Sequence, residues 1–326
     1  MKQIFALSAA LAAAIVAGQA LAASGKLVLY TSQPNQDAQQ TVDAFTKQHP
    51  DVEVEWIRDG TTKVMAKLRA EFAAGDPRPD VLLIADLVTM EGLKREGRLL
   101  PHPGAPVAAY DAGLYDADRH YFSTKLITTG IVYNVNAPIR PKSWADLAQA
   151  NAKGLVAMPS PLTSGAALIH LATLTGHPKL GWRYYEQLAD NGIQPKGGNG
   201  GTFKAVAGGD KLYGMVIDFL PIREKAKGSP VAFVFPDEGV SAVTEPVAIL
   251  KTARNPEAAK AFVDFLLSPE GQKLAASQGY LPAHPEVTPP PGFPPRSEIK
   301  LMAFDPEQAL ADAEANKKRF ADIFGQ

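Results

Sequence analysis

Gly154-Leu-Val-Ala-Met-Pro-Ser-Pro-Leu-Thr-Ser-Gly-Ala-Ala-Leu-Ile-His170 is a short apolar run that ends in proline and hydroxyl residues and opens directly into a helical pattern. A strand that leads into a helix in this way presents free backbone N–H groups and the positive helix end at one point. The hydroxyls of Thr163 and Ser164 lie at that point. The pattern predicts an anion site at the helix start. The alternative is an ordinary serine N-cap with no ligand.

The N-terminus has the pattern of an export signal. A basic start, Met1-Lys2-Gln3, is followed by an apolar stretch over residues 4–17 and by Ala20-Leu21-Ala22. This pattern predicts a signal peptide over residues 1–22 and a mature chain in the periplasm. A retained membrane anchor is the alternative, but the apolar run is shorter than the roughly 20 residues that span a bilayer.

Composition narrows the function further. The chain has 326 residues, 46% of them hydrophobic, which is enough for two lobes with real cores. It has no cysteine, which excludes disulfides and thiolate metal sites, and a formal charge of -1, which gives no attraction to nucleic acid. The six histidines show no metal-ligand spacing. We therefore expect a monomer that binds a small solute, with no cofactor, no metal and no nucleic acid.

The N-terminal region alternates strands with helices. We expect strands over residues 26–30, 52–57 and 81–84, and helices over residues 35–49, 61–72 and 87–96. Such alternation predicts an α/β lobe with a mainly parallel sheet, whose ligand groups lie at the carboxyl ends of the strands. The candidate ligand contacts at those ends are Ser32, Gln33, Thr61, Thr62 and Asp86.

The middle region repeats this organisation. We expect strands over residues 154–158 and 213–217, helices over residues 165–174, 179–191 and 202–207, and a glycine loop over residues 196–201. Two extended stretches, residues 125–134 and 243–250, are suited to be paired crossovers between lobes. The predicted lobes are residues 23–130 with 246–326, and residues 131–245. A proline-rich strap over 282–295 precedes a final helix over 306–324.

Three segments carry a resemblance to a known family. They are Leu27-Val-Leu-Tyr-Thr-Ser32, Pro141-Lys-Ser-Trp-Ala-Asp-Leu147 and Asn255-Pro-Glu-Ala-Ala-Lys-Ala-Phe-Val-Asp-Phe-Leu-Leu-Ser-Pro-Glu-Gly-Gln272. The mature chain resembles the periplasmic solute-binding proteins of ABC importers, in the group with ferric-, hexose-phosphate- and 2-aminoethylphosphonate-binding members. The resemblance implies the type 2 periplasmic-binding fold, with two α/β lobes and a two-strand hinge. It also implies a receptor that delivers its solute to a membrane permease with its ATPase.

The resemblance also indicates where the anion is held. In the family, a Ser-Gly-Ala at a helix start and an Asn before the next helix grip a phosphate or carbonate, and Ser164, Gly165, Ala166 and Asn199 match these positions. Thr61 and Thr62 would complete the site from the other lobe, unless they only cap their helix. Arg58 either pairs with the anion or is a solvated strand end. The glycine loop lacks the G-K-[ST] ending of a nucleotide P-loop.

Iron binding is the main alternative. Ferric members use a His, a Glu and two adjacent Tyr, and the corresponding residues here are Pro34, Ala85, Phe219 and Leu220. These side chains offer no hard oxygen or imidazole donor for Fe(III). Iron or iron-chelate binding would require another ligand set.

Three acids, Asp86, Asp218 and Glu245, follow predicted strands or stand in the second crossover. Carboxylates in the cleft would repel a bare anion but attract an ammonium or hydroxyl groups. The 2-aminoethylphosphonate-binding relatives are similar in having acids at the last two places, which favours an aminophosphonate or a comparable organophosphate. Alternatively, the acids pair with basic residues, for which Arg140, Arg223 and Lys225 are the candidates. Thr129, in the first crossover, completes the predicted contacts.

The sequence therefore predicts a non-catalytic solute receptor. A periplasmic phosphatase that uses Asp or Ser is the remaining alternative. Ser164 has no His or Lys at a recognisable spacing to activate it, so we expect no enzyme activity.

Overall fold

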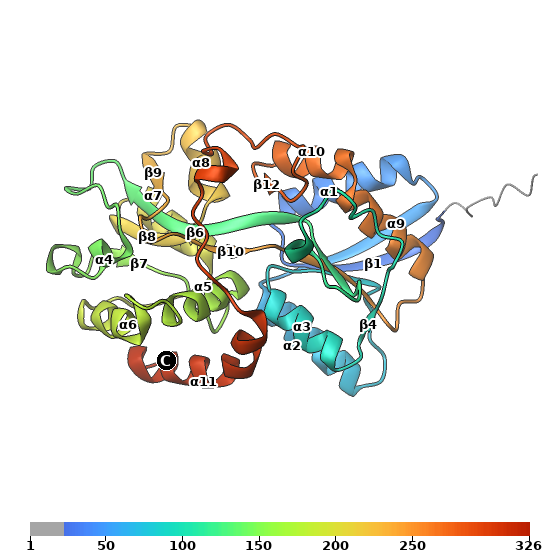
Figure 1. Cartoon of the computed structure of the whole chain (residues 1–326), viewed down its shortest axis with the longest axis horizontal. Helices are drawn as coiled ribbons and strands as arrows, with labels where there is room; N and C mark the ends of the chain where they lie inside the picture. The colour runs from blue at the N-terminus through green and yellow to red at the C-terminus, as the bar shows by residue number, and fades with distance from the viewer. Residues whose placement is uncertain (1–22) are drawn as a thin grey trace, which may run out of the picture.

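The computed structural model describes residues 23–326, so the predicted signal peptide, residues 1–22, lies outside the described residues. The chain is built around two six-stranded sheets, one in each of two lobes that lie side by side (Figure 1). This confirms the predicted two-lobed α/β fold. Between residues 23 and 326, no helix combines the length and the hydrophobicity needed to cross a membrane.

The first sheet has the strand order β2-β1-β3-β11-β4, and β5 also pairs with β11. β1 is parallel to β2 and to β3, whereas β11 is antiparallel to its three partners. The sheet is therefore mixed. Its strands are β1 (Gly25–Thr31), β2 (Val52–Arg58), β3 (Val81–Leu83), β4 (Leu99–Leu100), β5 (Tyr121–Ser123) and β11 (Pro246–Leu250).

Helices cover both faces of the first sheet, because its central strands are apolar on both faces, as parallel strands usually are. Leu27 and Leu29 of β1 pack in one core with Phe45 and Phe262, and Tyr30 packs in a second core on the opposite face. The first core is covered by α1 (Asn35–Gln48), α9 (Pro256–Leu267) and α10 (Pro269–Ser277), and the second by α2 (Thr61–Ala73) and α3 (Leu87–Arg95).

The second sheet differs from the prediction of a mainly parallel sheet. Its long strand β6 pairs antiparallel with β8, β9, β10 and β12, and only β7 and β8 are parallel. The reason is that β6 enters from the first lobe, so the later strands return against it. The strands are β6 (Lys125–Asn134), β7 (Val156–Ala157), β8 (Tyr213–Ile217), β9 (Val231–Val234), β10 (Ser241–Val243) and β12 (Leu281–Pro282).

Helices cover the second sheet on both faces as well. One core contains Ile131, Leu171 and Tyr185, and a smaller one on the other face contains Val132, Val206 and Val216. The helices are α4 (Trp144–Leu147), α5 (Gly165–Thr175), α6 (Gly181–Asp190), α7 (Asn199–Ala207) and α8 (Phe219–Ala226). Short 3-10 helices stand at Ala112–Leu114, Ala150–Ala152 and Arg296–Glu298.

Two crossovers join the lobes, but they pair with each other only at the start of the second predicted stretch, 243–250. Val243 lies opposite Ile127, whereas residues 246–250 form β11 of the first sheet. β6 covers the predicted stretch 125–134, and β10 pairs with it so that Ser241 lies opposite Thr129. The second crossover is not one strand, because it breaks at Thr244–Glu245 between β10 and β11. Glu245 has a φ of 36°, a left-handed conformation that is unusual for a residue other than glycine.

The final helix, α11 (Pro306–Phe324), contacts both lobes (Figure 1). Phe320 is buried in the core of the second lobe beside Tyr185, whereas Leu310 approaches Gly92 of α3 in the first lobe. We expected residues 246–326 to lie with the first lobe throughout. The two phenylalanines near the end of α11, Phe320 and Phe324, are the reason that its last turns lie with the second lobe instead.

Candidate ligand-binding site

The start of α5 has the geometry of an anion site. Ser164 is its N-cap, and the Ser164 hydroxyl accepts a hydrogen bond from Ala167 N at 3.4 Å. The N–H groups of Gly165 and Ala166 belong to the first helical turn, where no acceptor exists within the helix. They therefore remain free to bind an acceptor from outside.

Asn199 joins a second helix start to the first. Its Nδ2 donates to Ser164 Oγ at 3.3 Å, while its Oδ1 accepts from Ile217 N at 3.2 Å. We expected a glycine loop here with the helix beginning at Thr202, but α7 already begins at Asn199. The helix starts earlier because two of the loop glycines form its first turn. Two helix N-termini thus meet at the Ser164–Asn199 pair.

The first lobe contacts this pair at Gly165. A Cβ at Gly165 would lie 2.6 Å from Ala85 O, 3.0 Å from Asp86 Cβ and 3.1 Å from Thr61 Oγ1. Only glycine permits so close an approach between the lobes. The sequence-predicted residues Thr61, Asp86, Ser164 and Gly165 are therefore brought together, and Ala166 follows them as the second residue of α5.

Two further predicted residues lie near this contact, and a third does not reach it. Ser32 Oγ accepts a hydrogen bond from Ala85 N at 2.9 Å, which places Ser32 beside the carbonyl that touches Gly165. Arg58 donates from Nε to Gln33 O at 2.6 Å, which anchors the guanidinium at this edge of the sheet. Thr62 is exposed on the outer side of the first turn of α2.

Asp86 and Asp218 both receive internal hydrogen bonds. Asp86 caps α3 by accepting from the N–H and hydroxyl of Thr89, and burial raises the pKa of its carboxyl group. Asp218 accepts from Thr128 N at 2.8 Å, Thr128 Oγ1 at 2.7 Å and Phe219 N at 2.7 Å. Asp218 is fully buried, and this burial raises its pKa to about 7.

Glu245 is paired with an internal ammonium group. Lys125 Nζ lies 2.7 Å from Glu245 Oε2, and both side chains are only 3% exposed. Gln33 Nε2 approaches the same carboxylate at 3.5 Å. Burial raises the pKa of Glu245, while the charge of Lys125 opposes that rise. Gln33 Oε1 is buried and has no hydrogen-bond partner among residues 23–326.

A second ion pair lies close to the first. Arg223 of α8 lies 3.1 Å from Asp37 of α1 and thereby joins the two lobes. Tyr280 also donates to Asp37, and its ring lies 4.0 Å from Lys125 Nζ. The four charged residues, which we call the hinge cluster, are Asp37, Lys125, Arg223 and Glu245.

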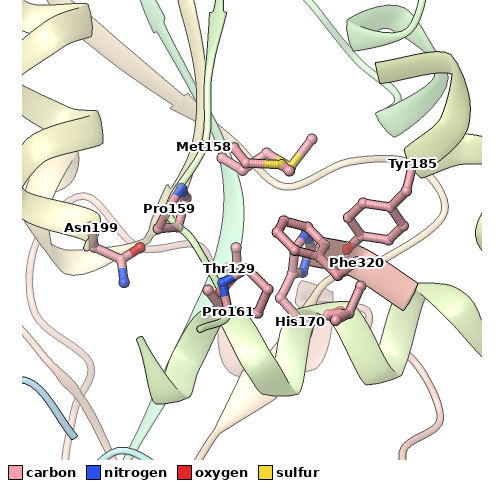
Figure 2. A pocket seen from close by; sticks show the side chains of 11 residues that line it. Thr129, Met158, Pro159, Pro161, His170, Tyr185, Asn199 and Phe320 are labelled. Atoms are coloured by element: carbon pink, nitrogen blue, oxygen red, sulfur yellow. The ribbon is translucent and has the colours of Figure 1, made fainter. Parts of the chain in front are cut away.

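Thr129 faces a small cavity inside the second lobe (Figure 2). The cavity has a volume of about 10 Å³ and is lined mainly by apolar groups. It is the size of a single water molecule and excludes a solute. Thr129 Oγ1 and His170 Nε2 are buried there without partners in the described part of the chain. Burial lowers the pKa of His170 to about 3, so its ring is neutral at physiological pH.

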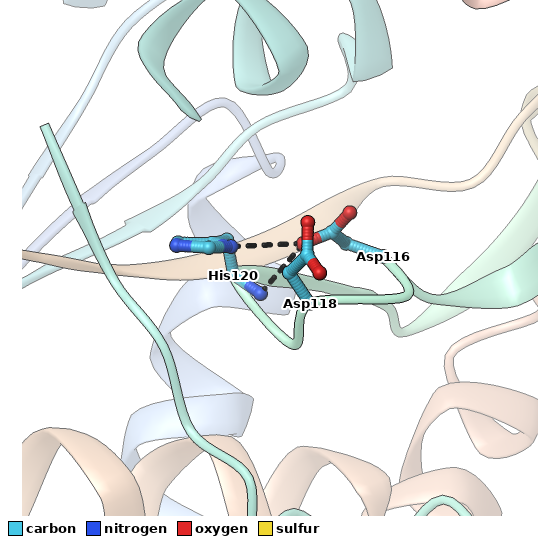
Figure 3. A group of neighbouring side chains, drawn as sticks. All are labelled: Asp116, Asp118 and His120. Atoms are coloured by element: carbon cyan, nitrogen blue, oxygen red, sulfur yellow. Dashed lines mark hydrogen bonds and ion pairs between the residues drawn. The ribbon is translucent and has the colours of Figure 1, made fainter. Parts of the chain in front are cut away.

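One group within residues 23–326 has a composition suited to metal binding, and a lysine is already paired with both of its carboxylates. Asp116, Asp118 and His120 have their ligand atoms within 4.8 Å of one another (Figure 3). Lys94 Nζ lies 2.6 Å from Asp116 and 2.9 Å from Asp118, so a cation is already present between the two carboxylates.

The sequence interpretation missed three of the four residues of the hinge cluster. Lys125 had a usable signal, because it is the one charged residue in the otherwise apolar or neutral stretch 125–134. Arg223 was considered only as a surface partner for the acids. Asp37 carried no signal. The helix dipole stabilises an acid in the first turn of any helix, so an acid there does not by itself indicate a tertiary partner.

The chain thus has two α/β lobes with a candidate ligand site between them, the architecture of a two-lobed binding protein. Residues 27–281 match the family of bacterial extracellular solute-binding proteins. An uncharacterised protein of Haemophilus influenzae is 30% identical over 92% of this chain and 90% of its own length. The chain therefore belongs to the bacterial extracellular solute-binding proteins, the class that serves ABC importers.

Two solved structures show the same fold. The periplasmic binding protein AfuA from Actinobacillus pleuropneumoniae, with exogenous fructose-6-phosphate bound, matches with a TM-score of 0.83 at 24% identity. The match covers 92% of this chain and 99% of AfuA. Iron-bound HitA from Pseudomonas aeruginosa matches with a TM-score of 0.78 at 20% identity, over 90% of this chain and 99% of HitA.

Proposed function

We propose that this protein is the periplasmic receptor of an ABC importer and captures a small solute that bears a phosphate or phosphonate group. In this proposal the solute bridges residues 131–245 and the lobe formed by residues 23–130 with part of 246–326. The protein then delivers the solute to an inner-membrane permease with its ATPase. Binding favours the closed form because only that form contacts the solute from both lobes.

The observation that carries this proposal is the Ser164–Asn199 pair, with Gly165 in contact with the first lobe. Two helix N-termini, a hydroxyl and an amide supply only neutral donors and positive helix ends, which suit a phosphoryl group. The proposed contacts around it are Ser32, Thr61, Asp86, Ser164, Gly165, Ala166 and Asn199, with Gln33 and Glu245 toward the hinge. Thr62 is left out, because it is exposed and does not reach this contact. We keep Thr129 and Asp218 as supports of the site. Thr129 faces a cavity that Asn199 also lines but that is too small for a solute, and the carboxylate of Asp218 is saturated by internal hydrogen bonds.

Iron or iron-chelate transport is the second candidate, since HitA is iron-bound. The positions that resemble the family's iron ligands hold Pro34, Ala85, Phe219 and Leu220 in this chain. Phe219 is buried against Tyr280 with their ring centroids 4.3 Å apart, and the Tyr280 hydroxyl is engaged by Asp37. These contacts favour the organic anion over the metal.

A thermal-shift panel tests the proposal. We expect phosphate or phosphonate esters to raise the melting temperature of the mature protein, and ferric citrate to leave it unchanged, because a ligand of the native state stabilises by mass action. Stabilisation by ferric citrate alone would contradict the proposal. We also expect that the protein does not hydrolyse a chromogenic phosphate ester. Measured hydrolysis would contradict the receptor function and indicate an enzyme.

A further inference from the structure

The hinge cluster is balanced in charge. It contains two cations, Lys125 and Arg223, and two anions, Asp37 and Glu245, and each cation lies within 3.1 Å of one anion. Three of these side chains are at most 3% exposed, and that of Arg223 is 23% exposed. A further charge brought among them would lose its hydration without gaining a free counter-ion, which is costly in a buried setting.

The cluster adjoins the anion site through a continuous set of contacts. Gln33 touches Glu245 with Nε2, and Gln33 follows Ser32 in the chain. Ser32 bonds Ala85, and the carbonyl of Ala85 lies against Gly165 at the phosphoryl end. Ser32 and Gln33 thus connect the phosphoryl end with Glu245, and the body of a solute held at Ser164 and Asn199 is taken to extend along them.

Two neutral side-chain atoms near that far end lack partners within the described chain, and so does the Nε of Arg223 in the hinge cluster, a cationic N–H that can only donate a hydrogen bond. Gln33 Oε1 and Thr244 Oγ1 are buried, and no other residue in the described range 23–326 bonds them. An amide oxygen accepts a hydrogen bond, and a threonine hydroxyl both donates and accepts. These groups match the hydroxyls of a solute, whereas an ammonium would require a carboxylate, and Lys125 has taken the carboxylate of Glu245.

From this arrangement we infer that Lys125 determines the specificity of the site: its ammonium occupies Glu245, so the receptor takes phosphate or phosphonate solutes with a hydroxylated, uncharged body and rejects those with an amine. This inference rests on the proposed function and reverses the preference for aminophosphonates that the acidic residues suggested in the sequence. Lys125 acts here as a built-in substitute for the amine of the solute.

Two matched pairs of probes test the inference by calorimetry. They are 2-hydroxyethylphosphonate against 2-aminoethylphosphonate, and glucose 6-phosphate against glucosamine 6-phosphate, and each pair differs by one hydroxyl or ammonium. We expect the wild-type protein to bind the hydroxyl member of whichever pair it accepts at least about ten-fold more tightly. Equal or tighter binding of the amine would overturn the inference.

Substitution of Lys125 gives the sharper result. In Lys125→Met the carboxylate of Glu245 is free, so we expect the preference to move toward the amine by roughly ten-fold or more. In Lys125→Met/Glu245→Gln the free carboxylate is gone and the hydroxyl preference returns. If the single variant does not fold alone, the amine probe should restore its melting transition, and the double variant still tests the preference.

The outcomes separate the two proposals. The role of Lys125 is overturned if the Lys125→Met variant has the same ratio of affinities for the amine and hydroxyl probes as the wild type. It is also overturned if the variant does not fold and no amine probe restores its melting transition. Either result leaves the receptor function standing. Failure of every phosphate and phosphonate ester to bind the wild-type protein overturns the proposed function itself.

Discussion

The anion site and the hinge cluster lie next to each other but are built on opposite principles. The anion site at Ser164 and Asn199 uses neutral donors and helix ends. The hinge cluster places four charges together and pairs each of them internally. The difference indicates that the neutral donors of Ser164 and Asn199 recognise the charge of the solute, beside an Asp86 carboxyl group that is bonded to Thr89, and that the paired charges of the hinge cluster set the lobes and the specificity.

The largest effect is expected in the hinge cluster. Arg223→Met removes the partner of Asp37, a carboxylate that is 1% exposed. A buried charge left without its partner costs about 3 kcal/mol in free energy of unfolding, which urea denaturation measures. Arg319→Met is the control, because its pair with Glu186 is exposed and should change stability by less than about 1 kcal/mol. If both variants lose a similar free energy of unfolding, the buried pair of the hinge cluster contributes no more to stability than an exposed pair.

The next effect is expected at the contact between the lobes. In Gly165→Ala the new Cβ would lie 2.6 Å from Ala85 O, which is too close for the two lobes to close fully. If the closed form falls to about 1% of the molecules, solute affinity falls roughly 100-fold. Gly200→Ala is the matched control in the first turn of α7, because its Cβ would meet no described atom within 4 Å. Calorimetry with the best ester of the panel should separate the two variants, and equal affinities would remove Gly165 from the site.

A smaller effect is expected from pH at Asp218. Its pKa is about 7 in the folded protein, against 3.8 for an unperturbed group, so the folded state retains a proton that the unfolded state has released. The contribution of Asp218 to stability is therefore complete below about pH 4, is lost as the pH rises to 7 and is constant above that. Relative to Asp218→Asn, the free energy of unfolding of the wild-type protein should fall by at least about 1.4 kcal/mol between pH 4 and 7. A constant difference between the two proteins across that range would contradict the assignment.

The smallest effect is expected for a single donor of the anion site. Ser164→Ala removes the helix cap and one hydroxyl, which should weaken ester binding by about 1 kcal/mol, or five-fold. Ser268→Ala removes an equivalent cap from α10, where Ser268 Oγ accepts from Gly271 N at 3.1 Å between α9 and α10 and is not among the proposed contacts. Both variants should lose similar stability, but only the first should lose affinity. Equal affinities would leave Ser164 as a cap alone.

Local pattern predicted most of the fold. The first crossover and the final helix have the predicted limits, 125–134 and 306–324, because periodicity and capping are local properties. The strand direction in the second lobe was wrong, since β6 starts in the first lobe and no local signal reports that. The start of α7 at Asn199 was missed because glycines seldom begin a helix.

The site was predictable in part for the same reason. The residues of the anion site stand at a helix start that the sequence itself displays, and the structure brings Ser164, Gly165 and Asn199 together. The hinge cluster joins residues that are far apart in the sequence, and its paired Asp37 and Arg223 stand 186 positions apart. A partner at that separation follows from the tertiary fold and not from any local pattern, so the internal pairing of Glu245 with Lys125 could not be foreseen.

One measurement tests the central claim most directly. It is a crystal structure of the mature chain with the phosphate or phosphonate ester that gives the largest thermal shift. We predict that the phosphoryl oxygens lie within hydrogen-bond distance of Ser164 Oγ, Asn199 Nδ2 and the N–H groups of Gly165 and Ala166, with the first lobe closed over them. A phosphoryl group bound instead to Lys125 or Arg223, with the Ser164 turn empty, would contradict the account.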